Sequence, residues 1–226
     1  VVRFLVAVLL LPVANGFGQP VAQAALNFAL NSPLWKLVMV PAARQNIVKT
    51  AESNGVRWKE CLEWISSLDW ETSDATETER VSSVESYPDY YCKSFHAYES
   101  GNLCWEAAFE QELAGRAVGA RNFPAFGEKG EDAFRDAFDN ALDEMGVLVP
   151  DGGIIVDLGC GTGTSTRRLA KRFPNAGVII GIDLSPYFIK IGQKLLDLAP
   201  KSILEEGGKW VTTIVPDARN ELRVGD

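Results

Sequence analysis

A glycine-rich turn between an apolar strand and a helix constrains the fold of this chain more than any other feature of its sequence. The apolar run Ile154–Leu158 predicts a buried strand, and Gly159, Gly161 and Gly163 follow it directly. Glycine lets the backbone turn tightly and approach a ligand at positions where a Cβ atom would obstruct the approach. The helix expected at residues 164–173 then directs its first amide groups toward the same place. The segment therefore predicts a ligand-binding loop at the carboxyl end of a strand.

Strands and helices continue to alternate after this turn. Residues 178–182 form a second apolar run, and Ser185 and Pro186 provide the N-cap and the first position of a helix expected to end near Leu198. The third strand is expected at residues 210–215. Buried strands that alternate with helices are typical of a parallel sheet covered by helices. The pattern therefore predicts an α/β fold built on a Rossmann-like, doubly wound parallel sheet.

An acidic residue stands at the end of each expected strand or just after it. Asp157 lies near the end of the first strand, where a carboxylate repels a pyrophosphate and attracts a cationic group such as an ammonium. Asp183 follows the second strand, a position from which an acid binds ribose hydroxyls, and Leu184 behind it can cover one face of an adenine. Asp217, next to Ala218, follows the third strand, where a carboxylate can accept a hydrogen bond from an adenine amino group.

The order of the glycines separates two classes of nucleotide-binding loop. A dinucleotide fingerprint has the order G-x-G-x-x-G, but Thr164 occupies the third glycine position here. With residues 157–163, Asp183 and Asp217 in this order and spacing, the chain resembles class I S-adenosylmethionine-dependent methyltransferases. The resemblance implies S-adenosylmethionine as the cofactor and methyl transfer to an acceptor, expected to be a small molecule of unknown identity. It implies these cofactor-binding residues: Asp157, Gly159, Cys160, Gly161, Thr162, Gly163, Asp183, Leu184, Asp217 and Ala218.

Two other function classes stay open. One is a protein that binds S-adenosylmethionine without catalysis, because the ligand loop carries no information about acceptor-binding residues, which usually lie later in this fold. The other, less favoured, is a nicotinamide- or flavin-binding oxidoreductase, which Thr164 and the carboxylate of Asp157 argue against. Cys160 is expected to be a small buried side chain rather than a nucleophile, so only its backbone is expected to reach a ligand.

The residues before the glycine loop predict a mainly helical segment with an aromatic cluster. Residues 69–86 are polar and acidic and indicate an exposed loop, and helices are expected at residues 102–121, capped by Asn102, and at residues 132–145. His96 is the only histidine. It is a weak catalytic candidate, as a general base or substrate contact in an aromatic lid, and the alternative is a locally satisfied core or surface histidine. The cluster contains Tyr87, Tyr90, Tyr91, Phe95, Tyr98 and Trp105.

A looser resemblance covers this N-terminal half. Residues 87–91, 95–98, 101–105 and 119–124 are similar to segments of plastid methyltransferase-like proteins of plants and algae. The resemblance carries no acceptor with it.

Charge and cysteine usage restrict the partners. The net charge of −8 disfavours a nucleic-acid partner, because a duplex repels an acidic surface that lacks a basic patch. The four cysteines form no CxxC pair, and with a single histidine the sequence predicts no metal site. The spacing of the cysteines also does not indicate disulfides, so we expect reduced thiols in a cytosol-like or stroma-like compartment.

The first residues resemble a targeting signal. Arg3 precedes an apolar run over residues 4–11, and Ala14 and Gly16 are spaced as at a signal-peptidase site. The run is shorter than the about 20 residues that span a bilayer, so no transmembrane segment is expected in the mature protein. With Phe17 after the small residues and no acidic residue before Glu52, the segment resembles the bipartite plastid presequences of algae with complex plastids. We expect localisation to the plastid (chloroplast), the alternative being a buried helix.

These observations divide the chain into four parts. We expect a signal-peptide-like segment at residues 1–16, a transit-peptide-like segment at 17–50, a helical and aromatic extension at 51–146 and the S-adenosylmethionine-binding domain at 147–226. By family resemblance the complete sheet has seven strands. We therefore expect an incomplete, inactive domain in which the strand Ile154–Leu158 lies at an unpaired edge.

Overall fold

The computed structural model describes residues 40–70, 86–95, 98–197 and 217–225, together with residues 23, 28, 32, 37 and 38. The expected presequence, most of the expected acidic loop, His96 and the strand expected at residues 210–215 lie outside the described residues or almost entirely so. The chain divides into two compact units, Val1–Gln45 and Asn46–Asp226. The helix α3 (Val40–Ser53) runs across that division.

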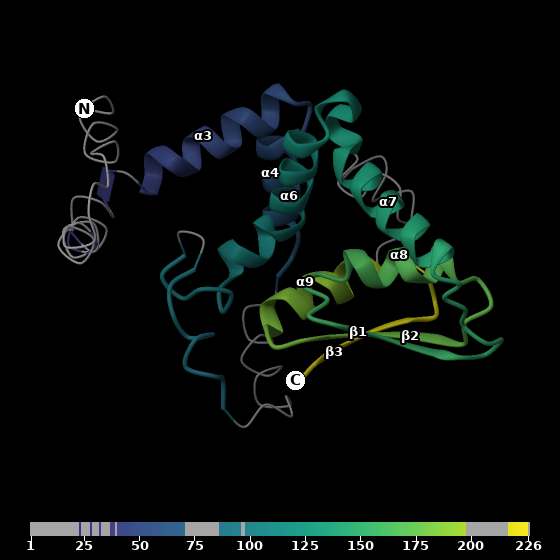
Figure 1. Cartoon of the computed structure of the whole chain (residues 1–226). Coiled ribbons are helices and arrows are strands. Elements are labelled where there is room, and N and C mark those ends of the chain that lie inside the picture. Colours follow the sequence, from purple (N-terminus) through teal and green to yellow (C-terminus); the bar gives the residue numbers. More distant parts are fainter. Residues whose placement is uncertain are drawn as a thin grey trace. The chain divides into compact units, whose positions relative to one another are not determined.

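A three-stranded parallel sheet forms the base of the second unit (Figure 1). Its order is β1 (Ile154–Leu158), β2 (Val178–Asp183) and β3 (Asn220–Val224). The helix α8 (Thr164–Arg172) connects β1 to β2, and α9 (Pro186–Asp197) follows β2. This order is that of one half of a doubly wound sheet, so the α/β, Rossmann-like fold predicted from the sequence is confirmed.

Both connecting helices lie on the same face of the sheet (Figure 1). Ile155 and Ile179 point from the strands toward α8, where they form a core cluster with Ala170. Beneath α9, the buried Leu222 of β3 packs with Ile189 and Cys160. The apolar residues of the strands and helices therefore close one side of the sheet.

The opposite face of the sheet is open along β1 in the described part of the chain. Ile154, Val156 and Leu158 are 67%, 52% and 74% exposed, although all three are apolar. Among the described strands, β1 pairs only with β2. Within the described residues, β1 is therefore an edge strand of this sheet.

Two helices that precede the sheet in sequence pack next to α9. The helix α6 (Trp105–Asn122) packs against α9, and α4 (Trp58–Ser67) packs against α6. Ile65, Leu113 and Ile191 are fully buried in the core cluster that the three helices share. The helix expected from Asn102 begins three residues later, after the N-cap Cys104. Asn102 instead accepts a hydrogen bond on its backbone oxygen from the hydroxyl of Ser185, at 2.7 Å.

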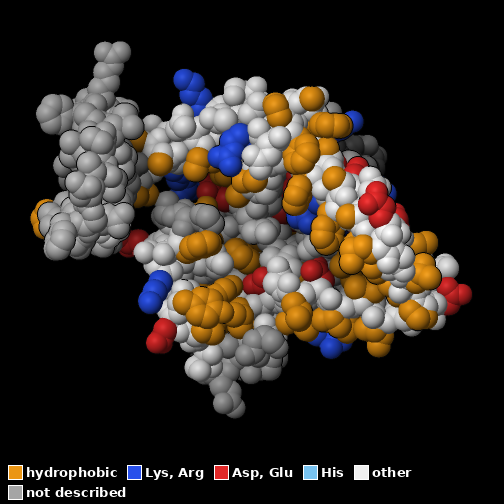
Figure 2. Space-filling model, viewed as in Figure 1, with side chains coloured by type: hydrophobic (Ala, Val, Ile, Leu, Met, Phe, Trp, Pro, Cys, Tyr) orange, Lys and Arg blue, Asp and Glu red, His pale blue; other side chains and the backbone are white. Residues whose placement is uncertain are grey.

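The last helix before the sheet, α7 (Gly130–Glu144), follows a short 3₁₀ segment, η2 (Pro124–Lys129). The face of α7 toward α8 is acidic. Its Asp132 and Asp143 form ion pairs with Arg168 and Arg172 of α8, at 2.9 Å and 2.7 Å. The apolar face of α7 is exposed, and Figure 2 shows hydrophobic side chains gathered over this helix. None of the helices in the described ranges is long and apolar enough to cross a membrane.

Candidate functional site

The glycine loop has the left-handed backbone that its sequence requires. The φ angles of Gly159, Gly161 and Gly163 are +72°, +58° and +82°, a region that favours glycine. The amides of Gly159 and Cys160 donate to the oxygen of Ile182, at 2.8 and 3.1 Å, and this ties the loop to the end of β2. A Cβ atom at Gly159 would meet no atom within 4 Å, so the backbone is open to a ligand there.

Asp183, the last residue of β2, faces the loop. One carboxylate oxygen accepts a hydrogen bond from the amide of Gly161 at 2.9 Å, and the other accepts one from the amide of Ser185 at 2.8 Å. The side chain of Ser185 in turn accepts the amide of Phe188 at 3.2 Å, which confirms the predicted N-cap of α9. Asp183 thus lies at the carboxyl edge of the sheet, with Leu184 half-buried beside it.

The carboxylate of Asp157 is bound to the first turn of α8, which follows the loop. Its carboxylate accepts hydrogen bonds from the hydroxyls of Ser165 and Thr166, both at 2.7 Å, in the first turn of α8. A negative charge at the amino end of a helix is stabilised by the helix dipole. Asp157 therefore fixes the start of α8 and adds negative potential beneath the loop.

The side chains of Cys160 and Thr162 point away from the open side of the loop. Cys160 is buried, and burial, together with the charges of Asp183 and Asp157, raises the pKa of its thiol to about 12. Thr162 is fully buried, with its hydroxyl toward α6. As predicted for Cys160, the loop offers its backbone rather than these side chains.

An aromatic segment far earlier in the chain reaches the site. The hydroxyl of Tyr91 donates to the carboxylate of Asp183 at 3.3 Å, and Tyr87 stacks on Tyr91 with ring centroids 6.0 Å apart. Burial and the charge of Asp183 raise the pKa of Tyr91. The sequence indicated the aromatic cluster but not its partner, and His96 lies outside the described residues.

Sequence reasoning missed two site-adjacent residues on α6. A Cβ atom at Gly161 would lie 2.6 Å from the side-chain nitrogen of Gln111, so this amide packs directly against the loop. Its neighbour Glu112 is buried and accepts a hydrogen bond from the hydroxyl of Thr162 at 2.9 Å. The sequence carries no signal for either residue, because polar and charged residues are spread along α6 and only tertiary packing brings these two to the loop.

The structure does not bring Asp217 and Ala218 to the loop. Both precede β3 and lie at its amino end, the sheet edge opposite to the loop, because β3 runs parallel to β2. Arg219 binds the carboxylate of Asp217 at 2.7 Å and lowers its pKa. The acid that follows β3 in the sequence is Asp226, two residues after Val224, and it lies outside the described residues.

Comparison with known families agrees with the geometry of the loop. Residues 155–207, which contain the glycine loop and Asp183, match the model of a methyltransferase domain. Over these residues the chain is similar to a methyltransferase domain. The family and its relatives imply S-adenosylmethionine as the cofactor of the domain.

Curated relatives are similar to the chain over short stretches. A trans-aconitate 2-methyltransferase of Acidovorax is 40% identical over 63 residues, which cover 28% of this chain and 24% of the relative. One from Deinococcus radiodurans is 43% identical over 77 residues, 33% of this chain and 28% of the relative. An uncharacterised methyltransferase of Emericella nidulans is 49% identical over 39 residues, 17% of this chain and 14% of the relative. The chain thus matches about a quarter or less of the length of these relatives, and no solved structure matches it significantly.

The segment that matches the methyltransferase model offers groups that suit this cofactor. The open backbone at Gly159 admits a ligand, and the carboxylate of Asp183 stands at the edge where ribose hydroxyls would bind. Asp157 and Asp183 both carry negative charge near the loop, which suits a sulfonium or an ammonium better than a phosphate. In the described part of the chain, no three histidine, cysteine, aspartate or glutamate residues form a cluster that could hold a metal ion.

Proposed function

We propose that this protein is an S-adenosylmethionine-dependent methyltransferase acting on a small-molecule acceptor. The observation that carries the proposal is the pair of carboxylates at the ends of adjacent strands, Asp157 and Asp183, around a loop with three left-handed glycines. This arrangement lies in the segment that matches a methyltransferase domain.

Each part of the site has a role in the proposal. Asp183 binds the ribose hydroxyls, the open backbone of the loop at Gly159 faces the amino-acid end of the cofactor, and Leu184 covers the adenine. The amide of Gly225 donates a hydrogen bond to the backbone oxygen of Asp183 at 3.0 Å, so the carboxyl ends of β2 and β3 are adjacent. Asp217 and Ala218 lie at the other end of β3, so we assign no adenine contact to them on this geometry.

The reaction is the displacement of a methyl group from a sulfonium by an acceptor nucleophile. S-adenosylmethionine supplies the electrophilic methyl group, and the chain contributes the positioning of cofactor and acceptor. If the acceptor is a hydroxyl or an amine, a general base assists, and His96 stays the weak candidate for that role. Two relatives are named for trans-aconitate, a small carboxylic acid, and we extend only the class of small molecule to this chain.

Calorimetric titration with S-adenosylhomocysteine, the product, tests the cofactor assignment. We expect one site in the wild type, and Asp183→Ala should weaken binding by about 1–3 kcal/mol through the lost charged hydrogen bonds. Equal affinity of the variant would contradict the ribose assignment. A protein that binds this ligand but forms no methylated product with extracts of candidate acceptors would favour the non-catalytic alternative.

We further propose that the protein acts in the plastid. The support is the short apolar run, the small residues Ala14 and Gly16, and the acid-free stretch before Glu52. A fluorescent protein fused after residue 60 should be imported into plastids, and sequencing of the native protein should find an N-terminus after Gly16. A fusion that stays in the cytosol would contradict the proposal.

A further inference from the structure

The glycine loop is held from behind by side chains of α6. The hydroxyl of Thr162 lies 2.6 Å from the side-chain oxygen of Gln111 and 2.9 Å from a carboxylate oxygen of Glu112. These contacts join residues about fifty positions apart in the sequence. Because Thr162 is fully buried, its contacts with α6 are shielded from water.

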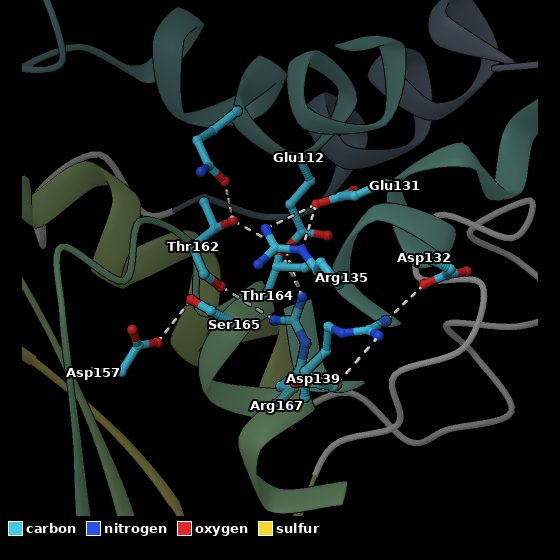
Figure 3. A network of polar contacts seen from close by, with 12 residues as sticks. Glu112, Glu131, Asp132, Arg135, Asp139, Asp157, Thr162, Thr164, Ser165 and Arg167 are labelled. Atoms are coloured by element: carbon cyan, nitrogen blue, oxygen red, sulfur yellow. Dashed lines mark hydrogen bonds and ion pairs between the residues drawn. The ribbon is translucent and has the colours of Figure 1, made fainter. Parts of the chain in front are cut away.

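A buried arginine completes this contact. Arg167 of α8 binds the same carboxylate oxygen of Glu112 at 2.6 Å and donates to the backbone oxygen of Thr162 at 3.1 Å. Figure 3 shows Glu112, Thr162 and Arg167 pointing toward one another from α6, the loop and α8. The carboxylate of Glu112 therefore binds both the loop, through Thr162, and the following helix α8, through Arg167.

Stability alone is a poor reason for this arrangement. The side chains of Arg167 and Glu112 are 1% and 5% exposed, and a buried ion pair is often no more stabilising than apolar residues of similar size. The Nε of Arg167 is buried without a hydrogen-bond partner, which adds a further cost. The pair instead restricts the position of the loop, because its contacts fix the loop backbone relative to α6 and α8.

We propose that Glu112 is a positioning residue of the cofactor loop. Through Thr162 and Arg167 it holds the loop in the left-handed conformation that presents its backbone to the ligand. The segment before the sheet is then part of the cofactor site rather than an appendage. The proposal rests on the proposed function for its ligand, but not for the conformation of the loop.

Two glutamates on one helix make a matched test. Glu112→Gln removes the charge that faces the loop. Glu110→Gln removes an equally buried charge whose carboxylate binds the hydroxyl of Tyr98, away from the loop. In the full chain without ligand, hydrogen exchange of a peptide covering residues 159–163 should be about 10-fold faster in Glu112→Gln, as expected for a locally loosened segment. Glu110→Gln should leave that exchange unchanged.

The same variants are then titrated with S-adenosylhomocysteine. Glu112→Gln should bind it about 10-fold more weakly, within the usual range of coupling between sites, and Glu110→Gln should bind like the wild type. The double variant Glu112→Met with Arg167→Met separates positioning from stability, because two apolar residues can replace a buried pair without loss of folding. The double variant should melt near the wild-type temperature, yet its loop amides should exchange as fast as those of Glu112→Gln.

The outcomes decide the two proposals separately. A folded Glu112→Gln or double variant with wild-type exchange in the loop would overturn the positioning role, whether or not any ligand binds. A wild type that shows no binding of S-adenosylhomocysteine would refute the proposed function, while the exchange measurement would still decide the role of Glu112. If Glu112→Gln does not fold, the double variant provides the same two measurements.

Discussion

Asp217 lies at the amino end of β3, where the side chain of Arg219 binds both of its carboxylate oxygens. This hydrogen bonding lowers the pKa of Asp217, whereas Asp183 at the other end of the sheet uses its carboxylate on the loop and on Ser185. Two acids with the same chemistry therefore have different surroundings, one at the amino end of β3 and one in the proposed cofactor site. The difference leads to a test at a single position.

We predict that Asp217→Asn leaves the affinity for S-adenosylhomocysteine unchanged and lowers the melting temperature at neutral pH. A lowered pKa in the folded state contributes stability above the unfolded pKa of about 3.9, and this contribution is lost as the pH falls through the folded value. The difference in melting temperature between wild type and variant should therefore be present at pH 7 and vanish in acid. A variant with much weaker ligand binding would restore Asp217 to the cofactor site.

A second prediction concerns the cysteines. A thiol with a pKa of about 12, as for Cys160, holds about one thiolate in ten thousand at pH 8, and its burial blocks access as well. Iodoacetamide at pH 8 should therefore modify the exposed Cys92 and spare Cys160, as peptide mass mapping would show. Rapid modification of Cys160 in folded protein would contradict the burial of this side chain.

The helices α6 and α7 approach closely at Gly119. A Cβ atom at Gly119 would lie 2.3 Å from the backbone nitrogen of Glu131, whereas one at Gly115 would come no closer than 3.3 Å, to the flexible carboxylate of the same residue. We predict that Gly119→Ala destabilises the protein by roughly 1–3 kcal/mol through overpacking. Gly115→Ala on the same helix should be neutral or stabilising by up to about 1 kcal/mol, because alanine favours helix. Urea unfolding measures both, and equal effects would refute the close crossing.

Elements of the sheet differ in how well the sequence predicts them. The bounds of β1 and the N-cap of α9 follow from local pattern and are confirmed. The strand β3 was missed, since a parallel strand was expected to be a continuous apolar run. In β3 only one face packs, on α9, and the other carries the exposed Glu221 and Arg223, so its pattern alternates.

The same contrast holds for α7 and for the site. The spacing of Phe134 and Phe138 indicated an amphipathic helix, and the helix formed, but its acidic face packs because α8 supplies two arginines. Asp157 and Asp183 could be predicted, as their positions depend on the strands that carry them. Tyr91 and Glu112 could not, because only the tertiary packing of distant segments brings them to the loop.

For the whole molecule, the apolar face of β1 that is exposed in the described part of the chain bears on behaviour in solution. We predict that Val156→Thr lowers the binding of a hydrophobic dye and the self-association of the 226-residue chain, with little change in melting temperature, because Val156 is 52% exposed. Ile155→Thr on the packed face is the matched control, and it should lower the melting temperature instead. Dye fluorescence and sedimentation measure the first effect. Unchanged association in Val156→Thr would show that another surface is responsible.

Arg219 also links β3 to the carboxyl end of α8. Its guanidinium donates hydrogen bonds to the backbone oxygens of Ala170, Phe173, Pro174 and Ala176, at 2.7 to 3.2 Å, around the carboxyl end of α8. A helix end leaves carbonyl groups without partners, and here a residue next to a strand nearly fifty positions later supplies the donors. The last turn of α8 therefore frays whenever β3 detaches, so the two must fold and unfold as a single cooperative unit.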